Sequence, residues 1–160
     1  DVAREAGYTR GALYHQFEGK QELTLAVVAW VEDTWYAEIG ELISGSADPV
    51  TALRAIARGH AVYCRRDIAR VMMALRVEFS GQDSPIERAV AHAVSRVVGD
   101  CTQLIALGRE SGLIPPGASP KLLAPALIGA IEGLVIAVSG ADPLDEELAE
   151  KVVDALLGLS

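Results

Sequence analysis

The sequence predicts an all-α fold, and three observations support that class. Hydrophobic residues make up 51% of the chain but aromatic residues only 5%, a balance of small aliphatic side chains that suits packed helices better than sheets. Helix starts are marked by a capping residue followed by proline. We find no useful length of alternating polar and apolar residues, so we expect no strands.

Four pairs of residues mark predicted helix starts: Asp48-Pro49, Ser84-Pro85, Ser119-Pro120 and Asp142-Pro143. Asp and Ser accept hydrogen bonds from the free N–H groups of a first helical turn, and proline there loses no bond. Glu87 follows Ser84 at the spacing of a capping box. The predicted helices are 2–6, 9–15, 20–43, 49–65, 68–79, 85–111, 120–139 and 143–158.

Apolar stripes predict which helix faces are buried. In helix 49–65 the stripe is Leu53, Ile56, Ala57, His60, Tyr63 and Cys64, and in helix 143–158 it is Leu148, Val152, Leu156 and Leu159. Helix 85–111 aligns Ile86, Val90, Val94, Val97, Cys101 and Ile105. Helix 120–139 is apolar almost all round, which predicts burial on more than one side.

Small residues recur on helix 120–139 at spacings of three and four, which allows two helices to approach closely. We therefore predict a homodimer in which this helix and helix 143–158 form a four-helix bundle across a two-fold axis. The interface residues we expect are Ala126, Gly129, Ala130, Gly133, Leu134, Ala137, Leu148, Val152 and Leu156.

The net charge of −8 argues against a protein that coats nucleic acid. Residues 1–20 sum to zero, however, because three basic groups balance three acidic ones, so a neutral head precedes an acidic body. Local DNA contact by such a head is compatible with this charge. The two cysteines, Cys64 and Cys101, have no metal-ligand spacing, and no apolar run approaches the roughly 20 residues of a membrane span. We expect a cytoplasmic chain with no metal, no cofactor and no membrane partner.

Residues 1–25 contain the strongest motif. A short apolar helix face ends at Gly7, which can form a tight turn, and Thr9 can cap a second helix that packs through Leu13 and Phe17. This is helix–turn–helix geometry, in which the start of the second helix enters a DNA major groove.

The same segment, VAREAGYTRGALYHQFEGKQEL, resembles the signature of the tetracycline-repressor (TetR) family. It carries A-x-x-A-G, then T-R-G-A-L-Y-H-x-F, then K-x-x-L at the matching spacing, and it begins after the family's first helix. The resemblance implies a transcriptional regulator that binds double-stranded operator DNA and is a repressor released by a small molecule. It also implies these DNA contacts: Thr9, Arg10, Gly11, Tyr14, His15 and Lys20. The head and connecting helix would span 1–43, and the ligand-binding and dimerisation domain 44–160.

The resemblance further implies a ligand chamber among the body helices. From the stripes we expect its lining among Trp35, His60, Tyr63, Met72, Phe79, Cys101 and Glu132, with a small apolar or cationic effector. His60 could instead be a hydrogen-bonded core residue. Glu132 could pair with an arginine, face solvent or hold a cation. We interpret both cysteines as small buried hydrophobic residues; the alternative is that they are redox sensors.

Enzyme function is not expected, and we predict no catalytic residue. The chain has no nucleophile elbow, zinc-protease motif, phosphate-binding loop or dinucleotide fingerprint. Two alternatives stay open: a helical small-molecule-binding protein without DNA binding, and a helical enzyme with an unrecognised site. DNA binding by a complete chain would separate the first alternative from the regulator, and turnover of a bound compound would support the second.

Overall fold

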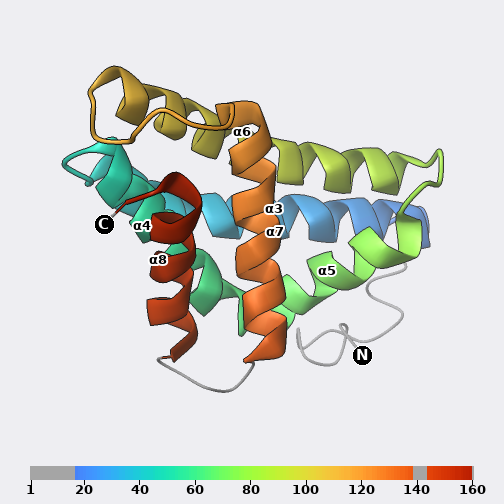
Figure 1. Cartoon of the computed structure of the whole chain (residues 1–160). Helices are drawn as coiled ribbons and strands as arrows, with labels where there is room; N and C mark the ends of the chain where they lie inside the picture. Colours follow the sequence, from blue (N-terminus) through green and yellow to red (C-terminus); the bar gives the residue numbers. More distant parts are fainter. Residues whose placement is uncertain (1–16, 139–143, 160) are drawn as a thin grey trace.

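A computed structural model describes residues 17–138 and 144–159, and over these residues every regular element is a helix. Figure 1 shows their arrangement. The helices are α3 (Lys20–Ser44), α4 (Pro49–Cys64), α5 (Asp67–Phe79), α6 (Pro85–Glu110), α7 (Pro120–Ala137) and α8 (Leu144–Leu157). The all-α prediction is confirmed for this part of the chain.

The helix boundaries agree closely with the sequence predictions, and two of the three predicted caps within the described residues form side-chain bonds. The third, Ser119, forms none at the start of α7, where Pro120 alone marks the helix start. Asp48 accepts from the backbone N–H groups of Val50 and Thr51 at 2.8 and 2.9 Å, and the Ser84 hydroxyl accepts from Glu87 N–H at 3.1 Å. The capping box differs in its second bond, since Ser84 N–H donates to the Gln82 carbonyl (2.9 Å). The predicted helices 2–6 and 9–15, and the Asp142-Pro143 start, lie outside the described residues.

Helices α3 and α6 lie side by side and run in the same direction, as Figure 1 shows. α7 crosses α6 and also contacts α4, and α8 lies beside α7 and packs on α4. α5 contacts α3, α4 and α6 near the end where the chain enters α3. One core therefore joins all six helices, with Leu53, Ile56, Ile105 and Ile131 among its fully buried residues.

Helix α7 is buried on one face of this single chain. Leu127, Ile131 and Val135 enter the core, whereas Leu122 and Ile136 are 68% and 64% exposed on other faces. Burial on more than one side, as the sequence predicts, would need a partner over the exposed face. By length and composition α7 would also pass as a membrane span, a test that core helices of soluble proteins pass as well.

The buried stripe of α8 differs from the prediction by one residue. The most deeply buried positions are Asp145, Ala149, Val153 and Leu157. The predicted stripe of Leu148, Val152, Leu156 and Leu159 is half-buried at its edge. The shift occurs because Asp145 is buried in an ion pair with Arg65, which a count of apolar residues cannot detect.

Candidate ligand-binding site

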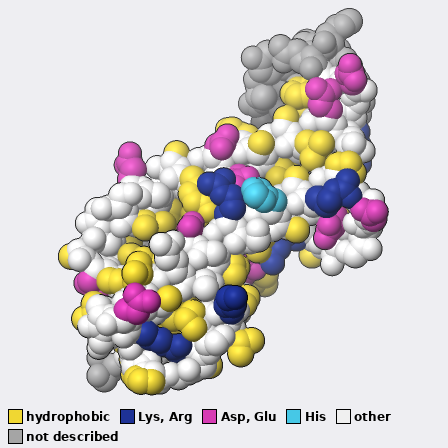
Figure 2. Space-filling model, turned by 90° about the horizontal axis from the view of Figure 1, so that it is seen from above, with side chains coloured by type: hydrophobic (Ala, Val, Ile, Leu, Met, Phe, Trp, Pro, Cys, Tyr) yellow, Lys and Arg dark blue, Asp and Glu magenta, His cyan; other side chains and the backbone are white. Residues whose placement is uncertain are grey.

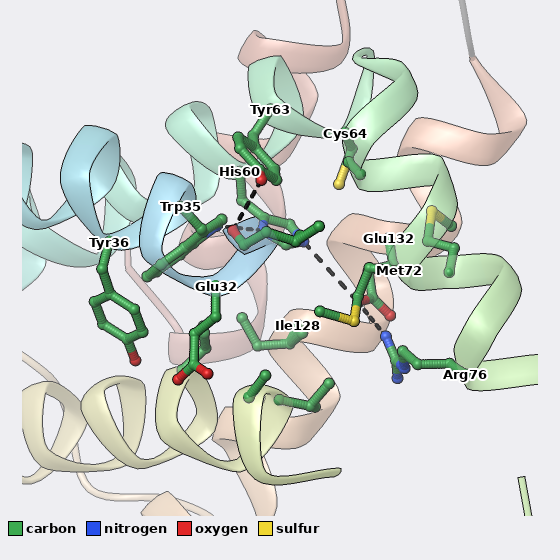
Figure 3. Close-up of a pocket in the computed structure, with 16 residues that line it drawn as sticks. Glu32, Trp35, Tyr36, His60, Tyr63, Cys64, Met72, Arg76, Ile128 and Glu132 are labelled. Carbon is green, nitrogen blue, oxygen red and sulfur yellow. Dashed lines mark hydrogen bonds and ion pairs between the residues drawn. The ribbon is translucent and has the colours of Figure 1, made fainter. Parts of the chain in front are cut away.

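A cavity of about 80 Å³ lies among α3, α4, α5, α6 and α7. Figure 3 shows side chains from these helices converging on it. Its wall is mainly apolar, with a few polar groups, which is the usual composition of a small-molecule site. The lining residues are Val31, Glu32, Trp35, Tyr36, His60, Tyr63, Cys64, Ala69, Met72, Met73, Arg76, Ala93, Val94, Val97, Ile128 and Glu132.

His60 is the main polar group in the wall. Its Nδ1 accepts a hydrogen bond from the indole N–H of Trp35, at 3.1 Å. Because an indole nitrogen can only donate, the proton of the neutral imidazole must be on Nε2. Burial, together with the charge of Arg76, lowers the pKa of His60 to about 4, so the ring is neutral at pH 7.

The Nε2–H of His60 is buried and has no hydrogen-bond partner. The nearest acidic oxygen is Glu132 Oε1, at 4.0 Å, which is too far for a hydrogen bond. A buried donor without an acceptor is costly. The cavity therefore contains one unmet hydrogen-bonding group in a mainly apolar wall (Figure 3).

Both carboxylates in the wall are paired with arginines. Arg76 of α5 binds Glu132 of α7, and Arg96 of α6 binds Glu32 of α3. Arg96 also lies over the Tyr36 ring, 4.2 Å from its centroid. Of the three roles considered for Glu132, the structure therefore supports the arginine pair.

Tyr63 ties α4 to α3 at the edge of the cavity. Its hydroxyl donates to the backbone carbonyl of Val31 at 3.0 Å. The Trp35–His60 bond joins the same two helices one turn further along α3. The cavity wall on this side is therefore held by two specific bonds as well as by packing.

Five of the seven residues predicted for the chamber line this cavity: Trp35, His60, Tyr63, Met72 and Glu132. Their role in binding a ligand stays a prediction. Cys101 lies outside the wall, because it is fully buried in the core. Phe79 lies in a neighbouring hollow between α5 and α6, where it packs near Ile86 and Val90.

The sequence reading missed Glu32, Tyr36 and Arg76 as cavity residues. A signal was available for Glu32, because it stands three residues before Trp35 and so lies on the same side of α3. Tyr36 directly follows Trp35, and that spacing carries no such signal. Arg76 had no such signal, since its partner Glu132 is 56 residues away in sequence.

The cysteines do not behave as reactive thiols in this structure. Burial raises the pKa of both Cys64 and Cys101 to about 12, so neither forms thiolate at neutral pH. Sensor cysteines have a low pKa and are exposed. These values favour the buried-hydrophobe reading over the redox-sensor alternative.

The arginines of α4 and α5, and the two between these helices, cover helix faces and do not form a basic patch. Each has an acidic partner: Arg54 with Asp154, Arg58 with Glu146 and Glu150, Arg65 with Asp145 and Glu146, Arg66 with Glu38, Arg70 with Asp67, and Arg76 with Glu132. Figure 2 likewise shows acidic and basic side chains interspersed on the face that α6 forms. These arginines therefore do not form a continuous basic surface for phosphates.

Most of the predicted DNA contacts lie outside the described residues: Thr9, Arg10, Gly11, Tyr14 and His15. Lys20 is described, and it is the exposed first residue of α3. A helix start with an exposed lysine is a suitable place for a DNA phosphate. The phosphate contact itself stays a prediction.

Five of the predicted dimer residues on α7 are exposed in the single chain: Ala126, Gly129, Ala130, Gly133 and Ala137. Leu134, Leu148, Val152 and Leu156 are half-buried. A side chain added at Gly129 or Gly133 would meet nothing within 4 Å. This face of α7 is therefore exposed in the single chain, as a dimer interface would be before the partner binds.

The start of the chain matches a family of known proteins. Residues 1–27 match the family described as "Bacterial regulatory proteins, tetR family". No curated protein matches the chain.

Solved structures share the fold over nearly the whole chain. SCO4454, a TetR-family transcriptional regulator from Streptomyces coelicolor, is 23% identical with a TM-score of 0.77, over 98% of this chain and 81% of its own. FadR from Bacillus subtilis, solved with stearoyl-CoA, is 16% identical with a TM-score of 0.78, over 99% and 86%. AibR, solved with isovaleryl coenzyme A and operator DNA, is 20% identical with a TM-score of 0.76, over 98% and 84%.

Proposed function

We propose that this chain, which belongs to the TetR family of bacterial regulatory proteins, is a one-component transcriptional regulator. Its head binds double-stranded operator DNA, and a small molecule in the body cavity changes that binding. The family match of residues 1–27 supports the first part, and the cavity supports the second. Two of the similar structures contain acyl-CoA compounds, and one of these also contains operator DNA, which makes a joint role reasonable.

The observation that carries this proposal is the bond between Trp35 and His60 at the cavity wall. Trp35 belongs to α3, the helix that begins at Lys20 directly after the head sequence. A ligand that moves His60 or Trp35 therefore acts on the helix that leads to the DNA-binding residues. A tilt of that helix would change the spacing of two heads on successive DNA grooves.

A ligand can weaken DNA binding only if it binds the DNA-incompetent arrangement more tightly. A coupling of ~1–3 kcal/mol is ordinary for such systems. The direction we propose is repression, with the free protein bound to DNA and the ligand-bound protein released. The domain division follows the same logic, with 1–43 as head and connecting helix and 44–160 as ligand-binding and dimerisation domain. As a DNA-binding regulator, the protein would act in the cytoplasm.

The regulator acts as a homodimer in this proposal, joined by α7 and α8. The open face of α7, with Gly129 and Gly133, supports this interface, because small residues let a partner helix approach closely. Gly133→Arg should give folded monomer or aggregate, since its side chain would project into the partner helix. Gly99→Arg is the matched control, because Gly99 is equally open on α6. A Gly133→Arg protein that sediments as a dimer of unchanged stability would contradict this interface.

The test of DNA binding is selection of bound sequences from random duplex DNA by the complete protein. We expect a palindromic site with half-sites about one helical turn or more apart. Lys20→Ala should weaken binding to all sequences and lower the salt slope by about one unit. Lys121→Ala, at an exposed lysine on α7, is the control that should change neither quantity. The proposal fails if no sequence is enriched.

A further inference from the structure

The cavity wall contains one hydrogen-bonding group that the protein leaves unmet. The ring of His60 is held on one side by Trp35, and its Nε2–H lies buried in the cavity wall with no partner (Figure 3). Tyr63 and Tyr36, the other polar rings in the wall, are both satisfied, by the Val31 carbonyl and by Asp100. His60 is therefore the one point in this described wall where an added acceptor would remove a penalty without breaking an existing bond.

The charges around this point select against charged ligands. An anion that accepted from Nε2 would lie close to the Glu132 carboxylate, whose Oε1 is 4.0 Å from that nitrogen, and would have to compete with that carboxylate for Arg76. A cation would have to take Glu132 or Glu32 from its arginine partner. A neutral ligand meets neither cost, because both ion pairs stay in place.

We propose that the effector of this protein is an uncharged, mainly apolar molecule whose single important polar group is a hydrogen-bond acceptor, such as a ketone or lactone carbonyl, bound to His60 Nε2–H. This inference rests on the proposed function and names the ligand class of its cavity.

The size of the cavity sets the size of the ligand. Its volume of about 80 Å³ is roughly half that of the ~150 Å³ engineered cavity that holds benzene. A ring compound therefore needs part of the wall to move. The α5 side is suited to this, because Met72 and Met73 are half-buried and flexible, and Ala69 is the one fully buried residue of α5.

Beyond Arg76 lies a second hollow of about 420 Å³ between α5 and α6, and Arg76 and Val94 border both spaces. A shift of α5 would join the two spaces around Arg76. A ligand with a longer apolar tail would then keep its carbonyl on His60 and extend along Val94. The hydrogen bond from His60 to the acceptor group of the ligand would be kept in both arrangements.

The test is an NMR titration of the dimeric protein with two probes of the same shape, cyclopentanone and methylenecyclopentane. The ketone carries an acceptor and the hydrocarbon carries none. We expect the Nε2 proton of His60 to shift with the ketone and to stay in place with the hydrocarbon. Cyclopentylamine and cyclopentanecarboxylate, the cationic and anionic relatives, should bind at least about 10-fold more weakly than the ketone, the size of one lost charge or hydrogen-bond term.

Variants sharpen the same test. His60→Phe should weaken ketone binding about 10-fold and leave hydrocarbon binding within about 2-fold, because the donor is lost and the apolar ring is kept. His60→Gln can still accept from Trp35 and donate into the cavity, so it should retain ketone binding. His92→Phe, at an exposed histidine of α6, is the matched control that should leave both affinities unchanged.

Equal responses to ketone and hydrocarbon at the His60 Nε2 proton would overturn the inference. That measurement uses the unaltered protein, so it holds even if His60→Phe fails to fold. Tighter binding of the amine or the carboxylate would also overturn it. If the ketone binds through His60 but DNA affinity stays unchanged, the ligand class stands and the proposed regulatory coupling fails.

Discussion

The two flanks of helix α4 are held in different ways. On one flank, Arg54 and Arg65 form ion pairs with Asp154 and Asp145 of α8, and Asp145 is fully buried. On the other flank, His60 borders a cavity whose far wall is α5, a helix with a single fully buried residue. One helix thus carries both a fixed contact and an incompletely packed one. The difference indicates where the body can yield to a ligand without losing its fold.

The functional consequence follows from packing. Core elements that are closely packed move little, whereas elements with few buried contacts open at lower free energy. We expect α4 and α8 to act as a frame, and α5 to move when the cavity is filled. α3 bonds to α4 at both Trp35 and Val31, so a shift at His60 reaches α3 directly.

The largest expected effect concerns pH and the cavity flank. His60 has a lowered pKa of about 4, whereas an unfolded histidine titrates near 6.5. Between these values the unfolded chain binds a proton that the folded chain does not, so stability falls as pH drops from 6.5 to 4. The loss should approach about 3 kcal/mol at pH 4, from 1.36 kcal/mol per pKa unit.

Urea unfolding at a series of pH values measures this loss. His60→Gln, which cannot titrate, should remove most of the slope between pH 6.5 and 4. His92→Gln should leave the slope in place, because His92 is exposed on α6. An unchanged slope in His60→Gln would mean that His60 is not buried as a neutral ring.

The next effect concerns the α8 flank. Asp145→Asn removes the charge partner that the Arg65 guanidinium contacts through two nitrogens, and that guanidinium is only 23% exposed. Breaking a buried pair is costly, and Arg65 retains Glu146, so we expect a loss of about 2 kcal/mol in unfolding free energy.

Asp67→Asn is the matched control on α5, because Asp67 pairs with Arg70 at a site where Asp67 is 94% exposed. Its unfolding free energy should be unchanged within error. Equal losses in the two variants, measured by urea unfolding at pH 7, would remove the distinction between the flanks.

The smallest effect concerns local opening. Backbone amides of α5 should exchange with deuterium at least about 10-fold faster than those of α4, because α4 has seven buried residues and α5 has one. Saturation with cyclopentanone should slow exchange in α5 more than in α8. Uniform protection across these helices would show that α5 is not the movable wall.

The sequence predicted helix starts well because capping is local. Asp48 and Ser84 bond to N–H groups two and three residues away, so their effect is visible in a short segment. It predicted α8 less well, because the burial of Asp145 depends on Arg65, which is 80 residues earlier.

Only part of the cavity wall was predicted, because only some of its residues are identified by a local pattern. His60 and Tyr63 lie on an apolar stripe that the helical period reveals. Arg76 lies in the cavity wall, where it pairs with Glu132, and Cys101 lies in the core instead of the wall. The helical period predicts neither position. Long-range ion pairs and the choice between core and cavity for a buried residue need the assembled helices.

A molecule in the cavity and DNA at the head should each weaken the binding of the other. The most direct measurement is fluorescence anisotropy of a selected duplex titrated with the complete protein, with and without saturating cyclopentanone or its larger ring homologues. The ketone should weaken DNA binding about 5- to 150-fold, and DNA should weaken ketone binding by the same factor. This factor should be smaller in Trp35→Phe, which removes the bond from α3 to His60. A ketone that binds at His60 while leaving DNA affinity unchanged would contradict this coupling between the cavity and the head.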